Sequence, residues 1–383
     1  MSDSAVYTRW AVLGAGVSGG RLSARFYQSQ HTGIMDRILF FTTDSKTNAN
    51  SIADVNNNLG LDEANEFIQQ HHFNIESADT NPYYQDSISW AKRMSQVLER
   101  VCTTDVLLHL AGAGTPAAGH VPCLSYLTDN PSSNPEAIFP EWMGCCTFGG
   151  VLAWPFKHEG EKHHFNAMVS LAQSSKWMDW TIVVANENIR TAAMPGKEPY
   201  SRINDRIIRL IELVITASRT PERILHPEDL KSLTQSVGTH VLIPGIASED
   251  PESIDRLRPL FDRAADQMFA PVDIATASQV FAIIEIPNTL FGTLPWTALN
   301  VKKIFAAWRE DYSMTGPSTI TIVPTDKDTI TAGLLVGGVD VAATFLESKI
   351  NYRRHKLFSD NEMSEEFLTS IDEALTDHVG LEI

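Results

Sequence analysis

Short uninterrupted apolar runs recur through the first half of the chain and are separated by stretches long enough for a helix. A strand that is apolar along its whole length needs cover on both faces, which a parallel sheet with helices on either side provides. The pattern predicts an α/β fold whose N-terminal part is a doubly wound domain with a mostly parallel sheet. The runs lie at residues 10–13, 38–41, 106–110, 151–154 and 180–184.

One long helix and a second set of strands follow. From Tyr200 to Ile215 apolar residues recur three and four positions apart over much of the helix circumference, so we expect this helix to lie between two layers. Further apolar runs predict a smaller C-terminal α/β domain with a mixed sheet. We divide the chain into a nucleotide-binding domain (1–198), a central helix (199–220), a C-terminal domain for activation and polymerisation (221–345) and a C-terminal tail (346–383).

Two glycine-rich loops each directly follow a predicted strand and precede a helix. The first, Gly14–Gly19, fits the pattern GxGxxG, and the second covers residues 111–119. Glycines let backbone N–H groups approach a phosphate at a helix N-terminus. The first loop alone fits a dinucleotide fold for NAD or FAD, or a tight turn with no ligand. Two such loops at neighbouring strand ends suit the three phosphates of a nucleoside triphosphate better.

Charge and cysteine content exclude several other classes. The chain has 47 Asp and Glu against 30 Lys and Arg, a formal net charge of −17, so nucleic acid and bare membrane are poor partners. Four scattered cysteines indicate reduced thiols. Neither a signal peptide nor an apolar run of membrane-spanning length is present in the sequence, so we expect a cytoplasmic protein without membrane insertion. The adjacent histidine pairs predict no zinc site.

Further motifs follow the two loops in a fixed order. They read FTTDSKTN after the second strand, WPFKHEGEKHH after a later one, then VVANENI, YSRINDRII and EDLKSLTQSVGTHVLIPGIAS. Together with the glycine loops, from about residue 10 to residue 345, they make the chain resemble the tubulin/FtsZ superfamily of filament-forming GTPases. The resemblance is nearer to the prokaryotic FtsZ-like members than to eukaryotic tubulin.

The resemblance implies GTP or GDP as the ligand, with Mg²⁺, and a contact for each part of it. The first loop would meet the α- and β-phosphates, the second the β- and γ-phosphates, and Asp44 would lie near the Mg²⁺. Glu159 would bond the ribose with Asn186 behind it, and Asn204 would read the guanine edge. A solvated turn carboxylate and a simple helix start are the alternatives for Glu159 and Asn204. The expected set is Gly14, Gly16, Gly19, Gly20, Arg21, Asp44, Gly112, Ala113, Gly114, Thr115, Glu159, His163, Asn186 and Asn204.

Several positions depart from the superfamily pattern. Arg21 stands where a base-contacting Asn is usual, and His163 replaces an Arg. The loop that senses the γ-phosphate lacks its glycines and carries Asp79. Pro116, in the second glycine loop, has no N–H to donate. These departures bear on guanine specificity, affinity and turnover.

The resemblance also implies head-to-tail assembly, with the second domain of one subunit covering the nucleotide of the next. The loop that serves catalysis has the form NxDxxD, and here it reads Ile-Leu-His-Pro-Glu-Asp over residues 224–229. Asp229 keeps its acid, His226 replaces the first acid, and Glu228 is a neighbouring carboxylate. General-base assistance is worth about 10²–10⁴-fold, so one remaining acid predicts slow GTP hydrolysis.

Two other functions remain open. One is a degenerate FtsZ-like assembly partner without hydrolysis, and the other is a Rossmann oxidoreductase that uses NAD or FAD. The cellular role, cell division or cell shape, is open as well. An amphipathic stretch around Phe367 and Leu375 in the tail either docks an adaptor or packs on its own chain.

Overall fold

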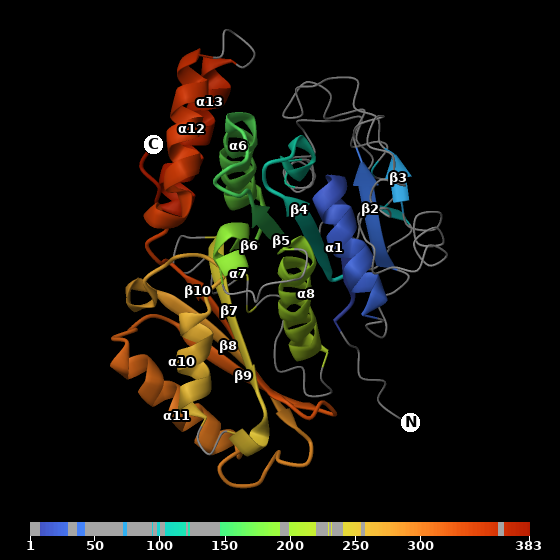
Figure 1. Ribbon diagram of the computed structural model, residues 1–383, viewed down its shortest axis with the longest axis vertical. Helices are drawn as coiled ribbons and strands as arrows, with labels where there is room; N and C mark the ends of the chain where they lie inside the picture. The colour runs from blue at the N-terminus through green and yellow to red at the C-terminus, as the bar shows by residue number, and fades with distance from the viewer. Residues whose placement is uncertain are drawn as a thin grey trace.

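The computed structural model describes residues 8–29, 37–42, 72–74, 94, 98–99, 104–119, 122, 146–191, 199–219, 229, 231, 240–253, 257–358 and 364–383. Within these ranges ten strands form one continuous sheet in the order β3-β2-β1-β4-β5-β6-β7-β10-β8-β9. The predicted α/β class, with a doubly wound first part, a long central helix and a smaller mixed second part, is confirmed (Figure 1).

The first six strands are parallel to one another. Alternate residues of β1 enter two different cores, with Trp10 and Val12 on one face of the sheet and Ala11 and Leu13 on the other. This double burial is the reason for the continuous apolar runs. The strands are β1 (Trp10–Ala15), β2 (Ile38–Thr42), β3 (His72–Asn74), β4 (Val106–Gly112), β5 (Thr147–Trp154) and β6 (Trp180–Ala185).

Helices cover both faces of this half of the sheet. On one face α1 (Gly16–Gln28) packs beside the central helix α8 (Pro199–Ser218), whose apolar side chains join the same core. On the other face lies α6 (Glu161–Trp177). Two short elements, η3 (Pro116–Gly119) and α7 (Asn186–Thr191), follow β4 and β6.

The second half continues the same sheet through a short junction. β7 pairs with β6 in parallel at only two positions, Thr181 with Val241 and Ile182 with Leu242. β10 lies antiparallel between β7 and β8, and β9 is parallel to β8, so this half is mixed as predicted. Its elements are β7 (Val241–Glu249), α10 (Arg258–Asp266), β8 (Gln279–Pro287), α11 (Ala298–Asp311), β9 (Ser318–Thr325) and β10 (Ile330–Gly337), with η6 (Pro251–Ser253) and η7 (Ile274–Thr276).

The chain then returns to the first half. Helices α12 (Ala342–Phe358) and α13 (Glu365–Val379) both pack on α6 (Figure 1). Ser348 accepts a hydrogen bond from Trp154 Nε1 at 2.9 Å, and Tyr352 stacks on Phe165 with ring centres 5.2 Å apart. Leu375 is fully buried, so the amphipathic stretch packs on its own chain. No helix in the described ranges is long and apolar enough to span a bilayer.

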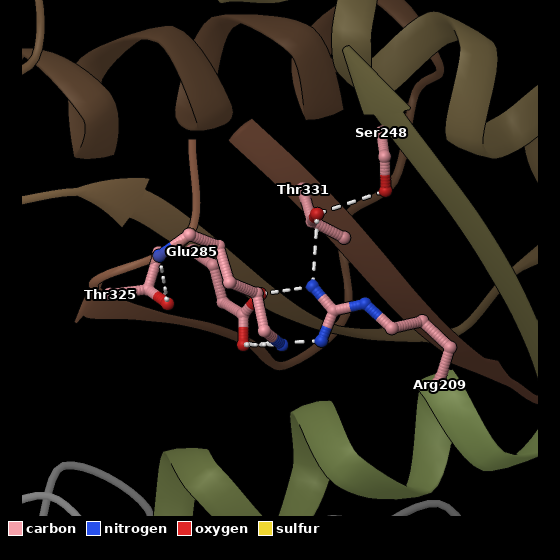
Figure 2. A network of polar contacts seen from close by, with 6 residues as sticks. Arg209, Ser248, Glu285, Thr325 and Thr331 are labelled. Atoms are coloured by element: carbon pink, nitrogen blue, oxygen red, sulfur yellow. Dashed lines mark hydrogen bonds and ion pairs between the residues drawn. The ribbon is translucent and has the colours of Figure 1, made fainter. Parts of the chain in front are cut away.

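A buried charge pair joins the central helix to the second half of the sheet. Figure 2 shows Arg209 of α8 reaching Glu285 of β8, whose side chain is only 1% exposed. The Arg209 guanidinium also donates to Thr331 Oγ1 of β10 at 3.1 Å, and Thr331 is bonded to Ser248 of β7 at 2.9 Å. Lys327 Nζ lies 3.7 Å from the second carboxylate oxygen. Each charge therefore has partners, as a buried ion needs.

Removing one partner of this pair is expected to be costly. Glu285→Ala leaves the Arg209 charge partly buried without its carboxylate. The free energy of unfolding measured in urea should therefore fall by about 3–5 kcal/mol. Arg9→Ala, which breaks the exposed pair with Asp105, is the matched control and should cost less than about 1 kcal/mol. The double variant Arg209→Met/Glu285→Leu should recover most of the loss. Equal losses for Glu285→Ala and Arg9→Ala would contradict a structural role for the buried pair.

Candidate functional site

A cleft of about 270 Å³ lies at the carboxyl ends of the parallel strands. Four chain segments that follow β1, β4, β5 and β6, together with α8, form its walls. The carboxyl edge of a parallel sheet is the usual ligand position in open α/β folds. The lining residues are Ser18, Arg21, Leu22, Gly112, Gly114, Thr115, Ala153, Pro155, Glu159, His163, Asn186 and Asn204.

The structure thus brings eight of the fourteen expected binding residues together around one cavity. Sequence reasoning missed Ser18, Leu22, Ala153 and Pro155. Ser18, Arg21 and Leu22 are three and four residues apart, so they share one helix face, and this spacing could have identified the first two misses. The eight expected residues that line the cleft are Arg21, Gly112, Gly114, Thr115, Glu159, His163, Asn186 and Asn204.

Gly14 and Gly19 have a packing role that the motif alone did not indicate. A Cβ on Gly19 would lie 2.2 Å from the Leu110 carbonyl oxygen, and one on Gly14 would lie 2.4 Å from the Gly19 oxygen. Helix α1 therefore crosses β1 and β4 at a distance that only glycine permits. Gly16, with φ +67°, starts the helix immediately after the strand. The other described residues of the expected set, Gly14, Gly16, Gly19, Gly20 and Ala113, are not among those that line the cleft.

Two side chains of α6 form hydrogen bonds with the second glycine loop. The Gly114 carbonyl accepts hydrogen bonds from His163 Nδ1 at 3.1 Å and from Asn166 Nδ2 at 3.2 Å. Two N–H groups of this loop are already used, since Ala113 donates to Ala153 and Thr115 donates to Gly112. The loop therefore offers a phosphate fewer donors than its glycine content suggests. The carbonyl only accepts, so His163 Nδ1 carries the proton and Nε2 is left as an acceptor in the neutral ring.

Two of the polar side chains that line the cleft, Glu159 and Asn186, have an oxygen that suits a ligand. Glu159 is half-buried, and its Oε1 accepts a hydrogen bond from the Phe156 N–H at 3.2 Å, a turn contact that leaves Oε2 for another donor. Asn186 is only 8% exposed, and within the described residues its Oδ1 has no hydrogen-bond partner. A buried amide oxygen without a donor costs free energy, so this atom fits a ligand N–H or O–H in the cleft.

Asn204 enters the cleft because the start of α8 is fixed against α1. Arg25 Nε donates to Asp205 Oδ1 at 2.6 Å, which ties the two helices together one residue beyond Asn204. Asp44 and the loop at residues 77–82 lie outside the described residues. The same holds for His226 and Glu228 of the expected catalytic loop.

Asp229 belongs to the opposite edge of the sheet. It is exposed, and Lys231, two residues later, makes an ion pair of 2.7 Å with Asp179 at the amino end of β6. The end of α8 lies at the same edge, because Trp10 at the start of β1 donates to Ser218 Oγ at 2.8 Å. Asn204 and Ser218 are 14 residues apart on one helix, or about 20 Å. The cleft and the Asp229 segment are therefore at opposite ends of α8.

Comparisons with known proteins fit this architecture. No protein-family model matches the chain. The tubulin-like protein CetZ of Pyrococcus abyssi is 26% identical over 200 residues, which is 52% of this chain and 50% of the relative. The CetZ of Pyrococcus furiosus matches to the same extent. The chain thus spans about half the length of the curated relatives it matches.

Solved structures agree over nearly the whole chain. CetZ2 of Haloferax volcanii, a GTPγS-bound protofilament, has a TM-score of 0.67 at 16% identity and covers 91% of this chain and 100% of its own. An empty FtsZ dimer of M. jannaschii has a TM-score of 0.63 at 17% identity, with 90% and 92% covered. At such identities the likeness shows the fold. With the CetZ matches, it confirms the resemblance to the tubulin/FtsZ superfamily.

A buried histidine beneath the second glycine loop makes stability depend on pH. His109 of β4 is fully buried, and its Nε2 donates to the Ala118 carbonyl at 3.0 Å. Burial lowers the pKa of His109 to about 4 from 6.5. The folded protein therefore resists protonation between pH 6.5 and 4 while the unfolded chain accepts the proton, so stability is full above pH 6.5 and falls below it.

We expect His109→Gln to flatten this dependence. We would measure the free energy of unfolding in urea between pH 7.5 and 4.5. As the pH falls, this free energy should decrease by up to about 1.4 kcal/mol more per pH unit in the wild type than in the variant. His158→Gln, a change at an exposed histidine, is the control and should keep the wild-type slope. Parallel pH curves for wild type and His109→Gln would show that His109 does not set the dependence.

Proposed function

We propose that this chain of the tubulin/FtsZ superfamily binds a guanine nucleotide with Mg²⁺ in the cleft and assembles head to tail into filaments that hydrolyse GTP slowly. One observation carries the proposal: the nucleotide cleft and the Asp229 segment lie at opposite ends of α8, about 20 Å apart. A chain cannot bring its own Asp229 to its own cleft. A second subunit stacked along the α8 direction can.

The cleft chemistry supports a nucleotide as the ligand. Arg21 is a cation in a chain with a net charge of −17, and it suits a phosphate or ribose oxygen by a charge-assisted hydrogen bond. The Asn204 amide offers an acceptor for the N–H groups that distinguish guanine from adenine, and Asn186 Oδ1 offers a buried acceptor for a further ligand N–H or O–H. Glu159 suits the ribose hydroxyls. A bound Mg²⁺ would neutralise phosphate charge that this acidic protein otherwise repels.

Catalysis in this arrangement needs a carboxylate from the neighbouring subunit. Asp229 would accept a proton from the attacking water, and the first subunit would hold the phosphates through its two glycine loops. The acid of the NxDxxD pattern that His226 replaces is missing, so turnover is slow. Filaments of this chain should accordingly persist longer than those of a fast GTPase.

Nucleotide binding is tested by calorimetry with GTP, GDP, ATP and NAD in the presence of Mg²⁺. We expect guanine nucleotides to bind and Asn186→Ala to weaken GTP at least 10-fold, since the buried oxygen loses its ligand partner. Asn351→Ala, at an equally buried Asn on α12, should bind as the wild type does. Absence of guanine binding at millimolar ligand overturns the proposal, and selective NAD binding supports the oxidoreductase alternative.

Hydrolysis in trans is tested with Asp229→Ala. We expect GTP binding to be unchanged and phosphate release to fall at least 10-fold, whereas Asp328→Ala, an exposed control, keeps the wild-type rate. Mixing Asp229→Ala with the binding-deficient Asn186→Ala chain should restore release, because each supplies what the other lacks. Phosphate release at the wild-type rate from Asp229→Ala alone refutes the role of Asp229 in hydrolysis. A wild type that forms filaments but releases no phosphate identifies the non-hydrolysing alternative.

A further inference from the structure

The outer face of α12 carries an apolar stripe that the described part of the chain leaves exposed. Among the described residues six large apolar side chains are exposed, and three of them are on this helix. Leu346, Ile350 and Leu357 are spaced by four and seven residues, so they share one face, and Leu357 is 78% exposed. Phe345 and Tyr352 on the opposite face are fully buried. The stripe is thus the outward face of a helix that is already anchored.

Cations border this stripe. Arg353 and Arg354 are exposed and Lys349 is half-exposed, while Lys356 is paired with Asp372 of α13. With Glu347 as its one acid, α12 carries a net charge of +3 from four cations and one anion. The chain as a whole has a net charge of −17, so this helix is a local exception. Its outward face suits an apolar surface that is bordered by carboxylates.

The neighbouring helix presents such carboxylates. α13 lies beside α12, tied to it by the hydrogen bond from Tyr352 to Asp372 at 2.9 Å, and both pack on α6. Its exposed acids are Glu365, Glu366, Glu373 and Asp377. Two half-buried apolar residues, Phe367 and Leu368, lie in its first turns. One face of the molecule thus holds a basic helix with an apolar stripe next to an acidic helix.

We propose that this two-helix face pairs with the same face of a second copy, across a two-fold axis that runs parallel to the helices. Such a rotation places α12 of each copy opposite α13 of the other, so cations meet acids twice in one contact. The apolar stripe is covered in the same contact. An anionic bilayer fits less well, since it would meet the acids of α13 and the charge of the whole chain.

The direction of the axis has a consequence for filaments. α12 and α13 run along the long axis of the molecule, as α8 does (Figure 1). A two-fold axis along this direction joins two head-to-tail strands side by side with the same polarity. The pairing needs no nucleotide, so it goes beyond the proposed function and is tested without it.

A charge-swap experiment tests the pairing. In sedimentation equilibrium at low salt without nucleotide, we expect the wild type to form a dimer that dissociates as salt rises. Arg353→Glu/Arg354→Glu and Glu366→Lys/Glu373→Lys should each raise the dimer Kd at least 10-fold. A 1:1 mixture of the two variants should restore dimers, because reversed α12 then meets reversed α13. Lys302→Glu/Lys303→Glu, with the same charge change on exposed positions of α11, should pair as the wild type does.

Three outcomes would each overturn the proposal. The wild type could stay monomeric at all protein concentrations over a 100-fold range, both reversed variants could pair as the wild type does, or the mixture of the two variants could fail to pair. Binding to phosphatidylglycerol vesicles that is lost in Arg353→Glu/Arg354→Glu, with no dimer in the wild type, would assign the face to anionic lipid instead. Calorimetry with GTP on the same variants keeps the two proposals apart. A charge-reversed chain that binds GTP but forms only single strands loses the pairing alone.

Discussion

The buried pair of Arg209 and Glu285 makes the central helix α8 a shared part of both halves of the molecule. The strand pairing that joins the two halves is short, since β6 and β7 pair at only two positions. The side-chain network of Arg209, Glu285 and Thr331 adds a connection from α8 to two strands of the second half. A desolvated charge pair tolerates little displacement, because separating the partners leaves a buried charge uncompensated. The second half of the sheet must therefore keep its position relative to α8.

This constraint fixes what the two ends of α8 can do. Asn204 at one end lines the cleft, and Ser218 at the other is bonded to Trp10 at the amino edge of the sheet. The helix is a spacer of fixed length between the cleft and the segment that contains Asp229. In the proposed head-to-tail assembly, a neighbouring subunit would bring its own Asp229 segment to this cleft.

The cleft itself departs from a simple phosphate cradle. Gly14 and Gly19 are needed for close packing of α1 on the sheet, and the Ala113 and Thr115 amides are used within the protein. The Arg21 guanidinium, which lines the cleft, can supply donors in place of some of these amides. A side-chain guanidinium is less fixed than a backbone amide, since holding it in one rotamer costs conformational entropy. This is a physical reason to expect weaker and less stringent phosphate recognition.

The sequence by itself determined the α/β class, the parallel first half and the central helix. Strands buried on both faces require continuous apolar runs, and a buried helix requires apolar residues at a period of 3.6. The order of the motifs, through the resemblance that it supports, also pointed to Arg21, Glu159 and Asn204, and these three residues line one cleft. Other features have no local signature. The Arg209–Glu285 pair joins residues 76 positions apart, and the Ala113 amide of the second glycine loop is used by Ala153 of β5. Only the tertiary structure decided these, because long-range contacts are set by packing.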